Sequence, residues 1–171
     1  MEANHFCSKK DTANGKFTEL ENYGRSGAAM KVFPTTANFG EQDEKPSLSF
    51  RFLIEETGNY TAEIWLTPTN SVQNKRPLRF ALESQNGQQI ITAVAADFNA
   101  GSHSDRKWCE GVLDQIRVCK TSLAFEKGVR EISIGAMEAA LVLERVLIYK
   151  EGNAHLASYL GPSESFFVAG N

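Results

Sequence analysis

The stretch SLSFRFLIEETGNYTAEIWLTP, residues 47–68, decides the fold class. Hydrophobic side chains alternate with polar ones before the turn residues 57–59 and again after them. A two-residue period is typical of a strand with one buried face. Two such runs joined by a short turn predict a hairpin. The alternating hydrophobic positions are Leu48, Phe50, Phe52, Ile54, Tyr60, Ala62, Ile64 and Leu66.

The same pattern continues along the chain. Residues 78–84 and 88–96 flank the turn QNG and predict a second hairpin. Residues 108–125 predict one long extended segment, bent at Gly111 because a lone glycine often marks a bulge. Residues 140–150, ALVLERVLIYK, are hydrophobic nearly throughout, which predicts a central strand.

The part of the chain before this stretch, residues 11–46, is looser and rich in Gly, Asn, Thr and charge. Within it, residues 28–34 predict a short strand and residues 17–27 predict a loop that presents Tyr23. Many short strands between turns predict an all-β protein, a β-sandwich of the jelly-roll type with about 8–10 antiparallel strands. We expect residues 1–150 to form it and residues 151–171 to form a tail that packs on it.

Composition excludes several classes of partner. A chain of 171 residues fits one domain. The net charge is −3 and no basic stripe occurs, so we expect no nucleic-acid partner. No run of about 18 hydrophobic residues occurs, so we expect no membrane-spanning helix. The opening MEANHF has no signal-peptide features; if the natural protein is exported, we expect that its signal has been removed or that this chain is a piece of a longer protein.

Three cysteines occur, without the spacing of a zinc site. If residues 108–125 are extended, Cys109 and Cys119 lie about 33 Å apart, which is beyond disulfide reach. A disulfide between Cys7 and one of the other two cysteines remains an alternative. Because the number of cysteines is odd, at least one thiol is free or forms an intermolecular bond.

No catalytic motif is present. The sequence has no GxSxG, no HExxH and no phosphate-binding loop. Paired carboxylates for glycoside hydrolysis stay open, because their spacing is spatial. The acidic residues mostly fall at strand ends and turns, which indicates solvated positions. We therefore predict no catalytic residue in this chain.

Aromatic residues outside the inward alternation suggest carbohydrate binding. Tyr23, Trp65 and Trp108 are such residues, and sugars bind to exposed aromatic rings with polar groups beside them. Arg25, in the same loop as Tyr23, completes the candidate set. The alternative is that each ring packs in a second layer or covers a sheet edge.

Several stretches carry a family resemblance. The opening MEANHF resembles the first strand of carbohydrate-binding modules of families 6 and 35, and residues 47–68 and 106–150 follow the strand order of such modules. The stretches ENYGRSGAAMKVFP (21–34), LTPTNSVQNKRPLRFALE (66–83) and SYLGPSES (158–165) resemble the C-terminal domain of glycoside hydrolase family 115, whose members are α-glucuronidases that act on xylan.

This resemblance implies a non-catalytic accessory domain. The partners of such a domain would be neighbouring domains and subunits of the parent enzyme, or a xylan-type glycan. The alternative function is an independent carbohydrate-binding module, and a free-standing enzyme is the third possibility. It implies an extracellular, periplasmic or cell-surface location in a carbohydrate-degrading bacterium. It also implies a sugar cleft at Tyr23 and Trp108, and a structural calcium ion as the only cofactor, held by Glu2, Asn4 and Glu144.

Overall fold

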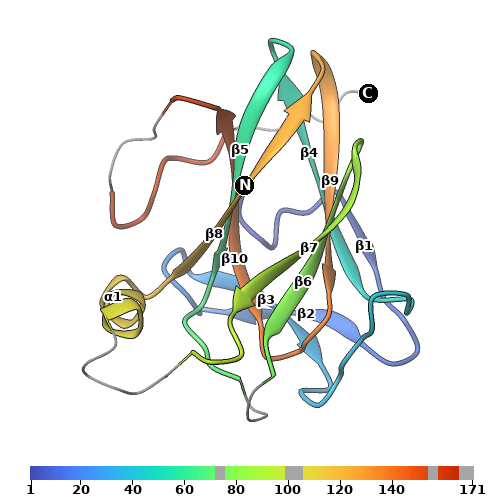
Figure 1. Ribbon diagram of the computed structural model, residues 1–171, viewed down its shortest axis with the longest axis vertical. Coiled ribbons are helices and arrows are strands. Elements are labelled where there is room, and N and C mark those ends of the chain that lie inside the picture. Colours follow the sequence, from blue (N-terminus) through green and yellow to red (C-terminus); the bar gives the residue numbers. More distant parts are fainter. Residues whose placement is uncertain (72–75, 99–105, 154–157, 166–171) are drawn as a thin grey trace.

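The computed structural model describes residues 1–71, 76–98, 106–153 and 158–165, which form a sandwich of two antiparallel sheets (Figure 1). The first sheet has the order β1 (Ser8–Lys10), β4 (Ser47–Ile54), β9 (Gly128–Ala136), β6 (Leu78–Ser84) and β7 (Gly87–Val94). The second sheet has the order β2 (Lys16–Glu21), β3 (Ala28–Phe33), β10 (Val142–Lys150), β5 (Gly58–Leu66) and β8 (Arg117–Phe125). The predicted sandwich fold is confirmed.

The core lies between the sheets and contains the alternating side chains of residues 47–68. Phe50 and Ile64 are almost completely buried, whereas Phe52 is partly buried and packs edge-on against Phe125 with ring centroids 5.3 Å apart. Burying each such side chain contributes about 1.5–3 kcal/mol. The two-residue period therefore places one face of each strand on a common core.

The predicted hairpin of residues 47–68 is wrong. β4 pairs with β1 and β9, whereas β5 pairs with β10 and β8, so the turn between them carries the chain from one sheet to the other. Alternation could not distinguish these arrangements, because both bury one face of each strand. The second predicted hairpin is confirmed, because β6 and β7 pair as far as Ser84 and Gly87 at the turn. Gly87 has φ 102°, a left-handed conformation that glycine adopts readily.

The predicted long strand of residues 108–125 is also wrong. A helix, α1 (Arg106–Asp114), precedes β8, and Gln115 at φ 55° ends it, so Gly111 is a helical residue and marks no bulge. None of the helical residues is fully buried, but Trp108, Cys109 and Val112 recur at helical spacing, a signal that the strand prediction overlooked. Arg106 and Glu110, four residues apart, form an ion pair of the kind that supports an exposed helix.

The cysteines consequently do not share a strand. Cys109 lies in α1 and Cys119 in β8, and none of the three cysteines, which all lie in the described part of the chain, forms a disulfide bond. Burial raises the pKa of the Cys119 thiol to about 11.

The predicted central strand is confirmed, because β10 lies between β3 and β5. The predicted loop of residues 17–27 is strand as far as Glu21, and the loop proper is residues 22–27, between β2 and β3. Within the described residues, no helix is long and hydrophobic enough to cross a membrane.

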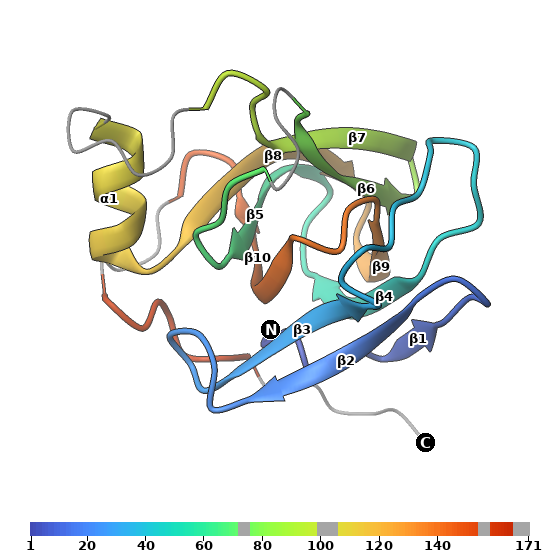
Figure 2. The ribbon, with the colours of Figure 1, turned by 90° about the horizontal axis from the view of Figure 1, so that it is seen from below.

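The tail crosses the outer face of the second sheet, on the same side of the molecule as α1 (Figures 1 and 2). The N-terminal segment lies beside it, since Glu2 bridges to Arg145 of β10. Residues 154–157 and 166–171 of the predicted tail lie outside the described residues.

Candidate functional site

Trp65 and Arg145 are direct cross-strand neighbours on the outer face of the second sheet. Trp65 points away from the main core that holds Ile64 and packs in a small separate cluster with Ile116 and Leu147. Although it lies on an outer face, Trp65 is only 4% exposed, because the tail covers it. An added Cβ on Gly161 would lie 2.5 Å from the indole Cη2, which shows how closely the tail backbone approaches the ring.

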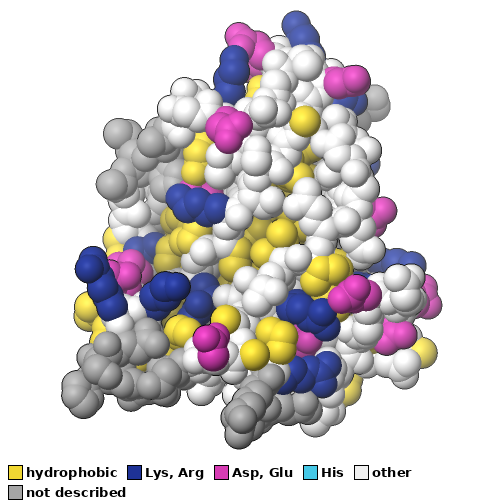
Figure 3. All heavy atoms as spheres, viewed as in Figure 1, with side chains coloured by type: hydrophobic (Ala, Val, Ile, Leu, Met, Phe, Trp, Pro, Cys, Tyr) yellow, Lys and Arg dark blue, Asp and Glu magenta, His cyan; other side chains and the backbone are white. Residues whose placement is uncertain are grey.

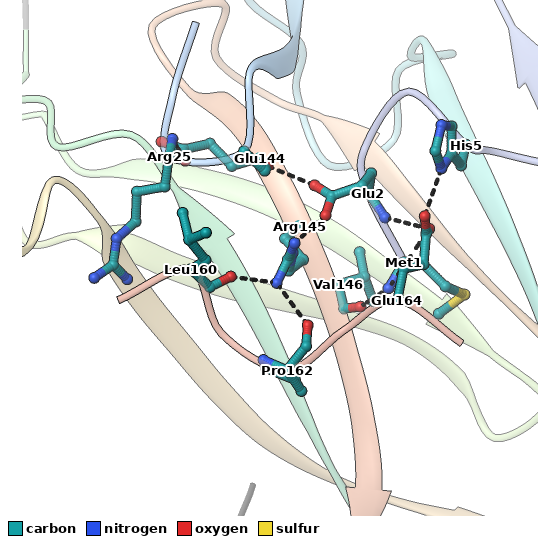
Figure 4. Close-up of polar contacts among 11 residues, drawn as sticks. Met1, Glu2, His5, Arg25, Glu144, Arg145, Val146, Leu160, Pro162 and Glu164 are labelled. Carbon is teal, nitrogen blue, oxygen red and sulfur yellow. Dashed lines mark hydrogen bonds and ion pairs between the residues drawn. The ribbon is translucent and has the colours of Figure 1, made fainter. Parts of the chain in front are cut away.

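Arg145 fastens the tail to β10 (Figure 4). Its Nη1 donates to the carbonyl oxygens of Leu160 at 2.5 Å and Pro162 at 3.0 Å, and its Nη2 donates to the carboxylate of Glu2. The arginine is 7% exposed. A buried charge is tolerated only when it is paired and hydrogen-bonded, and these three oxygens meet that requirement.

Glu164 fastens the far end of the described tail to the N-terminal segment. Its Oε1 accepts the backbone N–H of Glu2 at 2.7 Å, and its Oε2 lies 2.7 Å from Nδ1 of His5. Burial alone would raise the pKa of Glu164, but the hydrogen bonds from Glu2 and His5 bring it below the ordinary value. Tail, N-terminal segment and β10 thus form one polar network.

Arg25 and Tyr159 complete the cover over Trp65. The Arg25 guanidinium carbon lies 3.9 Å from the centroid of the Tyr159 ring and 5.5 Å from that of Trp65, which are cation–π distances. The Tyr159 hydroxyl donates to Oε1 of Gln115, just after α1, at 2.7 Å. The tyrosine is nevertheless 51% exposed, so part of its ring faces solvent.

Below this cover, Glu63 holds the indole in place. The carboxylate is 2% exposed and accepts Trp65 Nε1–H at 3.1 Å and the Tyr149 hydroxyl at 2.6 Å. It also forms an ion pair with Lys120 at 2.5 Å. Burial acts to raise the pKa of Glu63, but these hydrogen bonds and the Lys120 charge outweigh it and lower the pKa to about 2.

The structure brings together two of the four predicted carbohydrate-binding residues, Arg25 and Trp65. Tyr23 is 43% exposed in the same loop as Arg25. Trp108 lies on α1 against Phe98, with ring centroids 6.3 Å apart. A carbohydrate-binding role for these four stays a prediction.

Sequence reasoning missed two residues that build this region, Glu63 and Arg145. One signal was available. A charged pair, Glu144-Arg145, interrupts an otherwise hydrophobic central strand, and charges at buried positions are almost always paired.

The residues predicted to hold calcium do not fit that role. Glu144 is 1% exposed, and its two carboxylate oxygens accept the Arg25 backbone N–H at 2.9 Å and the Thr67 hydroxyl at 2.8 Å. The Asn4 amide donates to Glu19 at 2.9 Å, and Glu2 is bound to Arg145. No group of three or more His, Cys, Asp or Glu in the described part of the chain could hold a metal ion.

One family model matches this chain. It is the C-terminal domain of glycosyl hydrolase family 115, and it covers residues 1–164, the sandwich and the tail as far as Glu164. Curated proteins give no match.

Solved structures share the fold at low sequence identity. A family 115 4-O-methyl-α-glucuronidase, BtGH115A, described as specific for decorated arabinogalactans, aligns with 85% of this chain at 19% identity and TM-score 0.61; the match spans 18% of that enzyme. The C-terminal family 6 module of LamC from Zobellia galactanivorans aligns with 88% of this chain and 97% of the module at 12% identity and TM-score 0.53. A family 35 carbohydrate-binding module from Clostridium thermocellum aligns with 87% of this chain and 95% of the module at 6% identity and TM-score 0.55.

Proposed function

Since this chain belongs to the C-terminal domains of glycosyl hydrolase family 115, we propose that it packs against the remaining domains of such an enzyme. The domain is a non-catalytic accessory module, similar in fold to carbohydrate-binding modules. In BtGH115A the matched region is 18% of the chain, so most of a comparable enzyme would lie outside this domain and be available as its partner.

One observation carries this proposal. Eight large hydrophobic side chains are exposed among the described residues, and five of them come from three segments that meet: the end of α1, the start of β8 and the tail. We call these five the apolar surface. They are Val112, Leu113, Val118, Tyr159 and Leu160.

The three segments are joined by direct contacts. The Tyr159–Gln115 hydrogen bond links the tail to the end of α1. Val118 is the cross-strand partner of Trp65, over which Gly161 lies. Grouped exposed hydrophobic side chains mark contact sites more often than scattered ones. Figure 3 shows hydrophobic side chains gathered near the middle of the face drawn, with charged side chains of both signs around them.

Sedimentation velocity tests the packing role. The chain is mixed with the catalytic region of its parent enzyme, supplied as a separate polypeptide, and complex formation is measured. Leu113→Asp combined with Leu160→Asp should abolish the complex. Leu53→Asp combined with Val129→Asp is the matched control, since this exposed pair lies on β4 and β9 of the other sheet, and it should leave the complex intact. Equal binding by both double variants would contradict the proposal.

Glycan docking is the second candidate, because the exposed Tyr159 ring lies against Arg25, and the exposed Tyr23 lies two residues before Arg25 in the same loop. Calorimetry with glucuronoxylan and with a glucuronidated arabinogalactan tests it, the second ligand being chosen because BtGH115A is described as acting on decorated arabinogalactans. Binding that is lost in Tyr23→Ala and Tyr159→Ala would favour docking over packing. Either role suits an enzyme that degrades polysaccharides outside the cell or in the periplasm of a bacterium.

A further inference from the structure

The surroundings of the Arg145 guanidinium resemble those of a bound metal ion. One carboxylate, from Glu2, and two backbone carbonyls, from Leu160 and Pro162, point their oxygens at it (Figure 4). Carboxylate and carbonyl oxygens drawn from separate segments are the ligands that Ca²⁺ prefers. Here the positive charge at their centre belongs to the chain itself.

Each carboxylate oxygen of Glu2 and Glu144 already accepts a hydrogen bond from the protein. The second carboxylate oxygen of Glu2 accepts the Ser26 hydroxyl at 2.5 Å. Both oxygens of Glu144 already accept protein donors, the Arg25 backbone N–H and the Thr67 hydroxyl. The two carboxylates are therefore satisfied separately and do not converge on a common centre. Of the predicted ligands, only the Asn4 Oδ1 atom is buried without a hydrogen-bond partner, and one amide oxygen makes no site.

The backbone of the β2–β3 loop also closes over Glu144. An added Cβ on Gly24 would lie 2.7 Å from the carboxylate Oε2, and this glycine has φ 76°. A calcium ion needs six to eight oxygens at 2.3–2.6 Å. The loop leaves no room on this side of Glu144 for an ion with its remaining ligands.

We propose that Arg145 is a built-in cation that takes the place of a structural metal ion in this module. Its guanidinium clamps the N-terminal segment and the tail to β10, so the order of the tail depends on Arg145 and not on calcium. The proposal concerns how the tail is held, and it does not rest on the packing or glycan-binding role of the domain.

Calcium titration of the wild-type chain is the first test. After treatment with a chelator, we expect no heat of binding on addition of CaCl₂ and the same melting midpoint with chelator and with millimolar CaCl₂. Saturable binding with a raised midpoint would overturn the proposal, because it would show that a metal site coexists with the arginine.

Substitution of Arg145 is the second test, with Trp65 as its reporter in a Trp108→Phe background. Arg145→Met should release the tail, so that acrylamide quenches Trp65 fluorescence severalfold more strongly and the emission shifts to longer wavelength. Arg145→Lys, which keeps the charge but lacks the planar fork of donors, should show an intermediate effect. Arg51→Met, an exposed strand arginine paired with Glu131, is the control and should match the parent.

Glu2→Gln covers the case in which Arg145→Met does not fold. It removes one charged partner of the guanidinium at the chain start and leaves the core unchanged, so stronger quenching of Trp65 is expected again. Quenching at the parent level in Glu2→Gln, or in a folded Arg145→Met, would overturn the clamp.

Discussion

Glu63→Gln should remove a pH-dependent contribution to stability. In the folded state the pKa of this carboxyl falls from its ordinary value of 4.5 to about 2. A depression of about 2.5 pH units corresponds to about 3.4 kcal/mol, at 1.36 kcal/mol per unit. Because the folded-state pKa is lowered, this contribution is fully present above pH 4.5 and is lost as the pH falls through about 2.

The prediction is a difference that can be measured within an accessible range. Linkage predicts that about 2 kcal/mol of the contribution disappears between pH 6 and pH 3. The free energy of unfolding of the wild-type chain minus that of Glu63→Gln should therefore shrink by about this amount. Urea unfolding followed by far-ultraviolet circular dichroism gives both values, independently of the Trp65 environment.

Glu131→Gln is the matched control. This carboxylate lies on a strand of the other sheet, is 41% exposed and pairs with Arg51. Exposed pairs contribute about 0–1 kcal/mol, so the substitution should change little. If the difference between wild type and Glu63→Gln is the same at pH 3 and pH 6, then Glu63 does not carry the charge that binds Lys120, Tyr149 and Trp65.

Two further predictions follow from close approach and from burial. Gly161→Ala should displace the tail, because the added Cβ would lie 2.5 Å from the Trp65 ring. Gly152→Ala is the control for backbone strain alone, since Gly152 has a similar φ of 87° and nothing within 4 Å of an added Cβ. Equal quenching of Trp65 fluorescence in both variants would contradict the packing of the tail. Iodoacetamide at pH 8 should modify Cys7 well before Cys119 in the folded chain. Cys7 is exposed, whereas Cys119 is 9% exposed and has a pKa of about 11. Equal rates of modification of the two thiols, measured by mass spectrometry, would show that β8 opens readily.

The two-residue period of hydrophobic side chains predicted most strands correctly, because each strand buries one face in a common core. The almost unbroken hydrophobic run of residues 140–150 correctly predicted a central strand. Period carries no information on which sheet a strand joins, so the crossing between β4 and β5 was mistaken for a hairpin. The helical spacing of Trp108, Cys109 and Val112 was overlooked, so α1 was taken for strand.

The candidate site was harder to predict, because its members are distant in sequence. Arg145 contacts Glu2, which is 143 positions earlier, and the carbonyls of a tail 15 and 17 positions later. The alternation correctly placed Trp65 on the face opposite Ile64, but nothing local to it could show that the tail would cover it.

The cover over Trp65 bears directly on the choice between packing and glycan binding. A ring that stacks on a sugar must offer one face to solvent, and Trp65 is 4% exposed while Gly161 lies against it. The tail thus hides the largest ring of the outer face, and it exposes Tyr159 and Leu160 next to the hydrophobic side chains of α1. A protein partner, if the proposed packing role holds, would therefore contact Tyr159 and Leu160 and not the indole of Trp65. Arg145 holds the tail in that position.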